Sequence, residues 1–182
     1  MKNNKIVLIV LLAVLAALIA LAVIFYPKIA KLVRGDEVEE YPDAEDAAPF
    51  MVYTADGDVV DVNDYIGKRP IVVNFWASWC PPCVAELGDF NDMYEKYGDD
   101  VVFMMVNLTD GNRETLEKAS SFVEDNGYTF PVYYDTDQSG AYTYSIYSIP
   151  ETLFIREDGK IIYKQIGKIE RDALKSWIDK ID

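Results

Sequence analysis

A long, uninterrupted run of apolar residues begins near the start of the chain. Residues 6–25 contain no polar side chain. A helix of that length, rising ~1.5 Å per residue, reaches ~30 Å, which is the thickness of the hydrocarbon core of a bilayer. The pattern predicts a transmembrane signal anchor over residues 6–26, after a short cytoplasmic tail at 1–5. A cleaved signal peptide ending near Ala20-Leu21-Ala22 is the alternative, but the apolar region of such peptides is usually ~7–15 residues long.

Shorter apolar runs and regular spacings follow from residue 50 onward. Runs rich in β-branched and aromatic residues, bounded by turn signals, predict strands. Apolar residues spaced three and four apart predict helices. The expected strands cover 50–54, 59–60, 71–76, 101–106, 130–134, 152–155 and 161–163. The expected helices cover 83–97, 116–123 and 173–181, with a helical turn or two at 138–144.

The order of these elements predicts an α/β domain over residues 50–182. Turn residues at 56–57 and 157–160 each separate two strands, which predicts one β-hairpin near each end of the domain. The alternation of strand, helix, strand and helix between them predicts parallel pairing. We therefore expect a mixed central sheet with helices on both faces, extended by the N-terminal β-hairpin and preceded by one transmembrane helix.

The segment between the anchor and the domain, residues 27–49, changes the sign of its charge along its length. Lys28, Lys31 and Arg34 come first, and residues 35–49 then hold seven acids, no base and two prolines. Such a composition buries little apolar area, so we expect a juxtamembrane basic segment followed by a solvated acidic linker. After residue 34 the chain holds 12 basic and 31 acidic residues, a net charge of −19. This charge disfavours nucleic acid, which is not an expected partner.

The sequence contains two cysteines, Cys80 and Cys83, and no histidine. A structural zinc site needs four ligands, so no metal is expected. Attachment of c-type haem requires a histidine after the second cysteine, where this chain has Val84, and a Cys-His protease also requires a histidine. A redox pair remains as the functional interpretation. Two inert cysteines or a passive staple are the alternative, although a disulfide that closes so small a loop adds little stability.

The pair lies between the predicted strand at 71–76 and the helix that follows. The free amide groups and the positive dipole end at a helix N-terminus stabilise a thiolate, which is the attacking species. Pro81 fits the first helical position because an N–H there has no partner to lose. Cys83 lies on the inward stripe of the helix. We therefore predict Cys80 as the nucleophile, at an exposed tip, and Cys83 as the resolving cysteine.

Residues 72–83, Val-Val-Asn-Phe-Trp-Ala-Ser-Trp-Cys-Pro-Pro-Cys, resemble the active-site strand and helix start of thioredoxin-fold proteins. More narrowly, they resemble the TlpA/ResA/CcmG group, and the resemblance extends from Phe50 to the C-terminus. It implies a thioredoxin-like fold with a redox-active Cys80–Cys83 disulfide and no other cofactor. It also implies a membrane-anchored, extracytoplasmic reductase of client protein disulfides, in cytochrome c maturation or a similar thiol pathway. A membrane electron donor resembling CcdA would re-reduce it, and we expect a monomer.

Residues 148–155 resemble the segment that carries the cis-proline of this family beside the active site. The resemblance implies a cis Ile149–Pro150 bond, whereas only ~5–6% of X-Pro bonds in folded proteins are cis. It further implies that an extended client pairs with the backbone of Ile149 beside Cys80 as an added strand. A proline that only begins a strand is the alternative. The predicted client-binding residues are Trp79, Pro81, Pro82, Ile149 and Pro150.

One departure from the family concerns proton transfer. Thioredoxins have a buried acid where this sequence has Asn74, so the proton of Cys83 needs another acceptor. Glu86, three residues after Cys83 on the same helix, is the candidate. A solvated glutamate in the first helical turns is the alternative interpretation.

Three other functions compete with the reductase. A disulfide-forming oxidase uses the same atoms and differs in reduction potential, but strong oxidants of this kind resemble Cys-Pro-His-Cys proteins, and this motif has no histidine. A thiol peroxidase needs a threonine three residues before its cysteine, where this chain has Ala77. A non-enzymatic ectodomain that kept only the fold is the remaining alternative.

Overall fold

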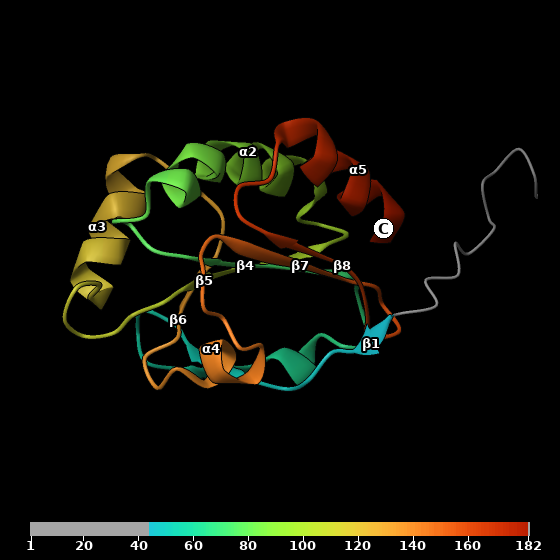
Figure 1. Ribbon diagram of the computed structural model, residues 1–182, viewed down its shortest axis with the longest axis horizontal. Helices are drawn as coiled ribbons and strands as arrows, with labels where there is room; N and C mark the ends of the chain where they lie inside the picture. Colours follow the sequence, from blue (N-terminus) through green and yellow to red (C-terminus); the bar gives the residue numbers. More distant parts are fainter. Residues whose placement is uncertain (1–43, 182) are drawn as a thin grey trace, which may run out of the picture. The chain divides into compact units, whose positions relative to one another are not determined.

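The computed structural model describes residues 44–181 (Figure 1). The predicted tail at 1–5, the anchor at 6–26 and most of the segment at 27–49 lie outside these residues. Within residues 44–181, no helix combines the length and the apolar character that crossing a bilayer requires.

The described residues form an eight-stranded mixed sheet. Its strands are β1 (Glu45–Asp46), β2 (Met51–Tyr53), β3 (Val59–Asp61), β4 (Ile71–Trp76), β5 (Val102–Asn107), β6 (Val132–Tyr134), β7 (Glu151–Ile155) and β8 (Lys160–Ile166). They lie in the order β1-β8-β7-β4-β5-β6-β2-β3. The three strands β4, β5 and β6 are parallel, as predicted. The predicted hairpins are confirmed as the antiparallel pairs β2–β3 and β7–β8.

Helices cover both faces of this sheet, as predicted (Figure 1). On one side lie α2 (Pro81–Tyr97), α3 (Leu116–Asp125) and α5 (Arg171–Ile181), and on the other lie α4 (Ser139–Thr143) and the 3₁₀ helix η1 (Val62–Asp64). Neighbouring residues of β4 point to opposite faces of the sheet. Asn74 donates a hydrogen bond to Glu86 of α2, whereas the ring of Phe75 packs against Gly140 of α4. A Cβ atom at Gly140 would lie only 3.0 Å from the Phe75 ring, so the glycine permits the close approach of α4.

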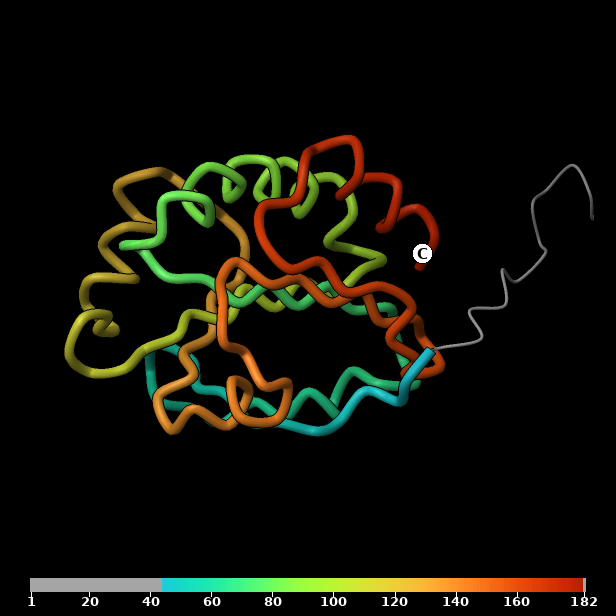
Figure 2. Tube along the Cα trace, in the orientation of Figure 1, coloured from blue at the N-terminus to red at the C-terminus, as the bar shows by residue number. Residues whose placement is uncertain are grey.

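The folded unit begins earlier than the predicted boundary at residue 50. Glu45 and Asp46, which we placed in the acidic linker, form β1 and pair with β8 at the edge of the sheet (Figure 2). The Lys160 ammonium lies 2.8 Å from the Asp46 carboxylate, and the backbone N–H of Ala47 donates to the carbonyl of Gly159 at 2.8 Å. Pairing at an edge uses backbone groups and leaves side chains in solvent, so it produces no apolar pattern that the sequence could reveal.

The topology brings two distant segments together at one end of the sheet. Because β4 and β7 are antiparallel, the last residues of β4 lie opposite the first residues of β7, and Phe75 pairs with Glu151. The turn from β4 into α2 carries Cys80, and Pro150 directly precedes β7. The predicted active-site residues therefore lie side by side.

Candidate active site

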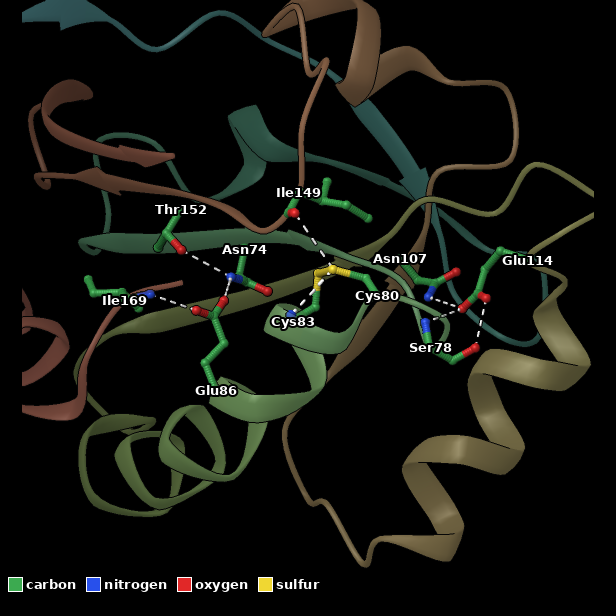
Figure 3. The surroundings of a disulfide bond; sticks show 10 residues. All are labelled: Asn74, Ser78, Cys80, Cys83, Glu86, Asn107, Glu114, Ile149, Thr152 and Ile169. Atoms are coloured by element: carbon green, nitrogen blue, oxygen red, sulfur yellow. Dashed lines mark hydrogen bonds between the residues drawn. A yellow bond between two sulfur atoms is a disulfide. The ribbon is translucent and has the colours of Figure 1, made fainter. Parts of the chain in front are cut away.

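Cys80 is the N-cap residue of α2, with extended backbone angles of φ −94° and ψ 105°. Pro81 and Pro82 occupy the first two helical positions, where N–H groups have no partner within a helix. The Sγ atom of Cys80 accepts a hydrogen bond from the backbone N–H of Cys83 at 3.3 Å. The two cysteines form a disulfide with their Cα atoms 5.3 Å apart (Figure 3). Both sulfurs thus lie at the positive end of the helix dipole.

The prediction that Cys80 lies at an exposed tip is wrong. Cys80 is 2% exposed and Cys83 is 0% exposed. The carbonyl oxygen of Ile149 lies 3.6 Å from the Sγ atom of Cys80, so the segment before β7 covers this sulfur from one side (Figure 3). The helical stripe could not reveal this cover, because Ile149 lies 69 positions away in the sequence.

The predicted client-binding residues differ in their exposure to solvent. The Ile149–Pro150 bond is cis, as the resemblance implied. Trp79 is 38% exposed, Pro81 and Pro82 are exposed, Ile149 is half-buried and Pro150 is buried. Trp79, Pro81, Pro82 and Ile149 are therefore at least partly open to solvent, whereas Pro150 is not.

A buried polar cluster lies behind the disulfide on the α2 side of the sheet. Glu86 is 0% exposed, so the alternative of a solvated glutamate is wrong. Its Oε1 atom accepts from the Asn74 Nδ2 group at 2.9 Å, and its Oε2 atom accepts from the backbone N–H of Ile169 at 2.8 Å (Figure 3). Asn74 also donates to the Thr152 hydroxyl at 3.0 Å. The buried acid of this cluster thus comes from α2, and Asn74 of β4 holds it by a hydrogen bond.

The environment of Glu86 changes its acidity. Burial raises the pKa of Glu86 from its ordinary 4.5 to about 7, although the hydrogen bonds from Ile169 and Asn74 act in the opposite direction. A carboxyl group with such a pKa takes up and releases a proton near neutral pH, which is the property required of a general acid or base.

A second buried carboxylate, Glu114, was not identified from the sequence. It lies in the loop before α3 and is 0% exposed. Its oxygens accept from the backbone N–H of Ser78 at 2.8 Å, from the Ser78 hydroxyl at 2.7 Å and from the Asn107 Nδ2 group at 2.7 Å (Figure 3). Glu114 thereby ties the turn before Cys80 to the end of β5. An acid in a polar loop looks solvated in the sequence, and no spacing distinguishes it.

Together these residues form a dithiol–disulfide site. The pair Cys80 and Cys83 can exchange two electrons with another disulfide. The helix start favours the thiolate of Cys80, and Glu86 supplies a titrating group behind the pair. The half-buried Ile149 lies beside the pair, with its carbonyl oxygen 3.6 Å from the Cys80 Sγ atom.

Known proteins resemble this chain in sequence and in fold. A family model described as Redoxin matches residues 40–178. The thiol-disulfide oxidoreductase ResA of Bacillus thuringiensis is 31% identical over 137 residues, which is 75% of this chain and 77% of that protein. The sporulation thiol-disulfide oxidoreductase A of Bacillus subtilis is 31% identical over 134 residues, or 73% of this chain and 79% of that protein. The crystal structure of StoA from Bacillus subtilis matches with a TM-score of 0.62 and 30% identity, over 72% of this chain and 96% of that one. The fold is the thioredoxin-like α/β fold.

Proposed function

Since this chain belongs to the Redoxin family and is a thiol-disulfide oxidoreductase, we propose that it reduces disulfides of client proteins on the extracytoplasmic side of a membrane. The observation that supports this proposal best is the disulfide between Cys80 and Cys83 at the start of α2, beside the backbone of Ile149. That arrangement combines a reactive pair with a place for an extended client.

The reaction begins with the reduced pair. The Cys80 thiolate attacks one sulfur of the client disulfide, whose S–S bond breaks as a mixed disulfide forms, and the other client sulfur leaves as a thiolate and takes up a proton. Cys83 loses its proton, and its thiolate attacks the Sγ atom of Cys80. The second client thiol is released and the Cys80–Cys83 disulfide forms. Two electrons have then passed from the pair to the client.

The two prolines at the helix start support the reducing direction, because they limit how far the helix start stabilises the Cys80 thiolate. A disulfide oxidant is strong when its reduced form is stabilised, above all by hydrogen bonds and charges on the attacking thiolate. Here Pro81 and Pro82 stand between the cysteines, and proline has no N–H to donate. The backbone N–H of Cys83 donates to the Sγ atom of Cys80, but the two residues before it cannot. A less stabilised thiolate makes the reduced pair a better electron donor.

We assign to Glu86 the transfer of the Cys83 proton. It lies almost one helical turn after Cys83 on α2. Its raised pKa of about 7 lets the carboxylate accept a proton at neutral pH and so promote formation of the second thiolate. Asn74 and the backbone of Ile169 hold the carboxylate in place.

The cellular setting is part of the same proposal. Residues 6–26 would anchor the protein in the membrane as a single span, and the acidic linker would hold the domain away from anionic headgroups. A membrane dithiol donor resembling CcdA would re-reduce the pair. The clients would be thiol proteins of cytochrome c maturation or a similar pathway. The protein would act as a monomer without metal or further cofactor.

Insulin reduction with trapping variants tests the activity. Wild type should reduce insulin with a dithiol as electron source, Cys80→Ser should be inactive, and Cys83→Ala should accumulate a mixed disulfide on Cys80 that mass spectrometry detects. No dithiol-dependent turnover by wild type, or a rate with Cys80→Ser equal to that of wild type, would support the non-enzymatic ectodomain instead. A glutathione redox titration tests the direction: a reduction potential near about −120 mV would indicate an oxidase, whereas we expect a value closer to about −270 mV.

A further inference from the structure

Arg113 lies directly over the ring of Trp79. The guanidinium carbon is 3.5 Å from the ring centroid. Trp79, the residue before Cys80, is 38% exposed, and Arg113 is exposed as well. A guanidinium that stacks on an indole face keeps its N–H groups at the edge of the plane, where they can bind another group. One cation is therefore held at the surface next to the attacking cysteine.

The loop that carries Arg113 is held on both sides of this residue. The Asp110 carboxylate accepts from the backbone N–H of Asn112 at 2.8 Å and of Glu114 at 2.9 Å. The backbone N–H of Gly111 donates to the carbonyl of Glu114 at 2.9 Å. The buried Glu114 side chain accepts from the backbone and side chain of Ser78. These bonds join the loop of Arg113 to the active-site turn, and they hold the backbone from which its side chain reaches the Trp79 ring.

Arg113 has no carboxylate partner among the residues that the structure describes. In residues 44–181, no ion pair within 4.0 Å involves Arg113, whereas Lys164, Arg171 and Lys175 each pair with an acid. Residues 44–181 carry 25 acidic and 12 basic residues, so most of the domain surface repels an acidic segment. The Trp79–Arg113 pair is a local exception at the active site.

We propose that Arg113 selects clients that carry a carboxylate beside the cysteine that Cys80 attacks. This inference rests on the proposed function. Ile149 lies on one side of the disulfide, and Ser78 and Glu114 lie on the other (Figure 3). A client segment that pairs with Ile149 and presents its sulfur to Cys80 brings a flanking side chain to the Trp79 side. A carboxylate there gains charge-assisted, two-pronged hydrogen bonds from the guanidinium, whereas an ammonium is repelled.

Matched peptides test this selection. Each of three peptides contains the same single disulfide. The peptides differ only in the residues that flank the attacked cysteine, which are Glu in one, Gln in the second and Lys in the third. The full-length protein in its reduced form reduces each peptide at low salt, and kcat/KM is measured for each. Flanking charge also changes the reactivity of a peptide disulfide itself, so each rate is divided by the rate with dithiothreitol.

For wild type, the corrected kcat/KM should be highest for the Glu peptide, about threefold lower for the Gln peptide and about threefold lower again for the Lys peptide. Arg113→Gln should remove the ranking and Arg113→Glu should reverse it. Lys68→Gln is the matched control, because Lys68 is exposed and precedes β4 at the opposite end of that strand from Cys80. This control removes the same charge and should keep the wild-type ranking. Added salt should reduce the wild-type differences.

The ways in which the proposal can fail are distinguishable. If the Glu/Lys ratio of Arg113→Glu equals that of wild type, or if Arg113→Gln slows all three peptides equally, the selection is refuted while the reductase activity stands. If wild type reduces none of the peptides, the proposed function fails, and this inference fails with it.

Discussion

Replacement of Glu86 by glutamine should change how the stability of the domain depends on pH. Burial raises the pKa of Glu86 from 4.5 to about 7, so the folded state binds this proton more tightly than the unfolded state does. The resulting stabilisation is fully present below pH 4.5 and is lost as the pH rises through 7. At ~1.4 kcal/mol for each pH unit between the two values, the loss amounts to ~3 kcal/mol.

Glutamine does not titrate, so this loss is absent from the variant. The amide carbonyl of the new side chain can still accept from Ile169, and any other effect of the substitution is a pH-independent offset. The nearby Lys168 lowers and Asp89 raises the pKa of Glu86, and both remain in the variant. Between pH 4 and pH 8 the variant should therefore gain ~3 kcal/mol of unfolding free energy relative to wild type.

Urea unfolding followed by tryptophan fluorescence at several pH values measures this difference. The oxidised protein is used, so that the thiols do not titrate. A second variant, Glu124→Gln, removes one charge from the exposed end of α3 and corrects for the change in net charge. If the unfolding free energies of Glu86→Gln and wild type differ by the same amount, within ~0.5 kcal/mol, from pH 4 to pH 8, the raised pKa of Glu86 is refuted.

Two further predictions concern the buried carboxylates. In rapid-quench experiments, Glu86→Gln should slow resolution of the mixed disulfide by about tenfold or more, because the proton of Cys83 loses its acceptor. Formation of the mixed disulfide should slow much less. Equal slowing of both steps would remove Glu86 from the mechanism. Glu114→Ala should lower the urea-derived unfolding free energy by ~3 kcal/mol, because it leaves the buried Asn107 donor and the partly buried donors of Ser78 without an acceptor. The exposed Asn112→Ala in the same loop is the control, and a loss below ~1 kcal/mol in Glu114→Ala would contradict the buried network.

Local patterns predicted the elements that have a strong apolar period. The run at 71–76 coincides with β4 because every residue of this strand is buried. The run at 101–106 is displaced by one residue from β5, which ends at Asn107. That asparagine is polar yet 0% exposed, because its side chain donates to Glu114. A polar residue whose hydrogen-bond partner lies in the following loop ends the apolar run before the strand itself ends.

The cysteine spacing, the absence of histidine and the strand-to-helix junction were enough to indicate a redox pair with Cys80 at the N-terminus of a helix. These features are local, because a helix dipole and its free N–H groups depend only on where the helix begins. The resemblance of residues 148–155 to the cis-proline segment added the second element of the site.

Only the tertiary structure decided which groups surround that pair. Cys80 is covered because Ile149 comes from a segment 69 residues away, and Glu86 is buried because Ile169, 83 residues away, donates to it. Glu114 is buried because Ser78, 36 residues away, donates to it twice. A carboxylate can leave water only where such donors converge on it, and their convergence depends on how the strands and helices pack, which no local spacing of residues records.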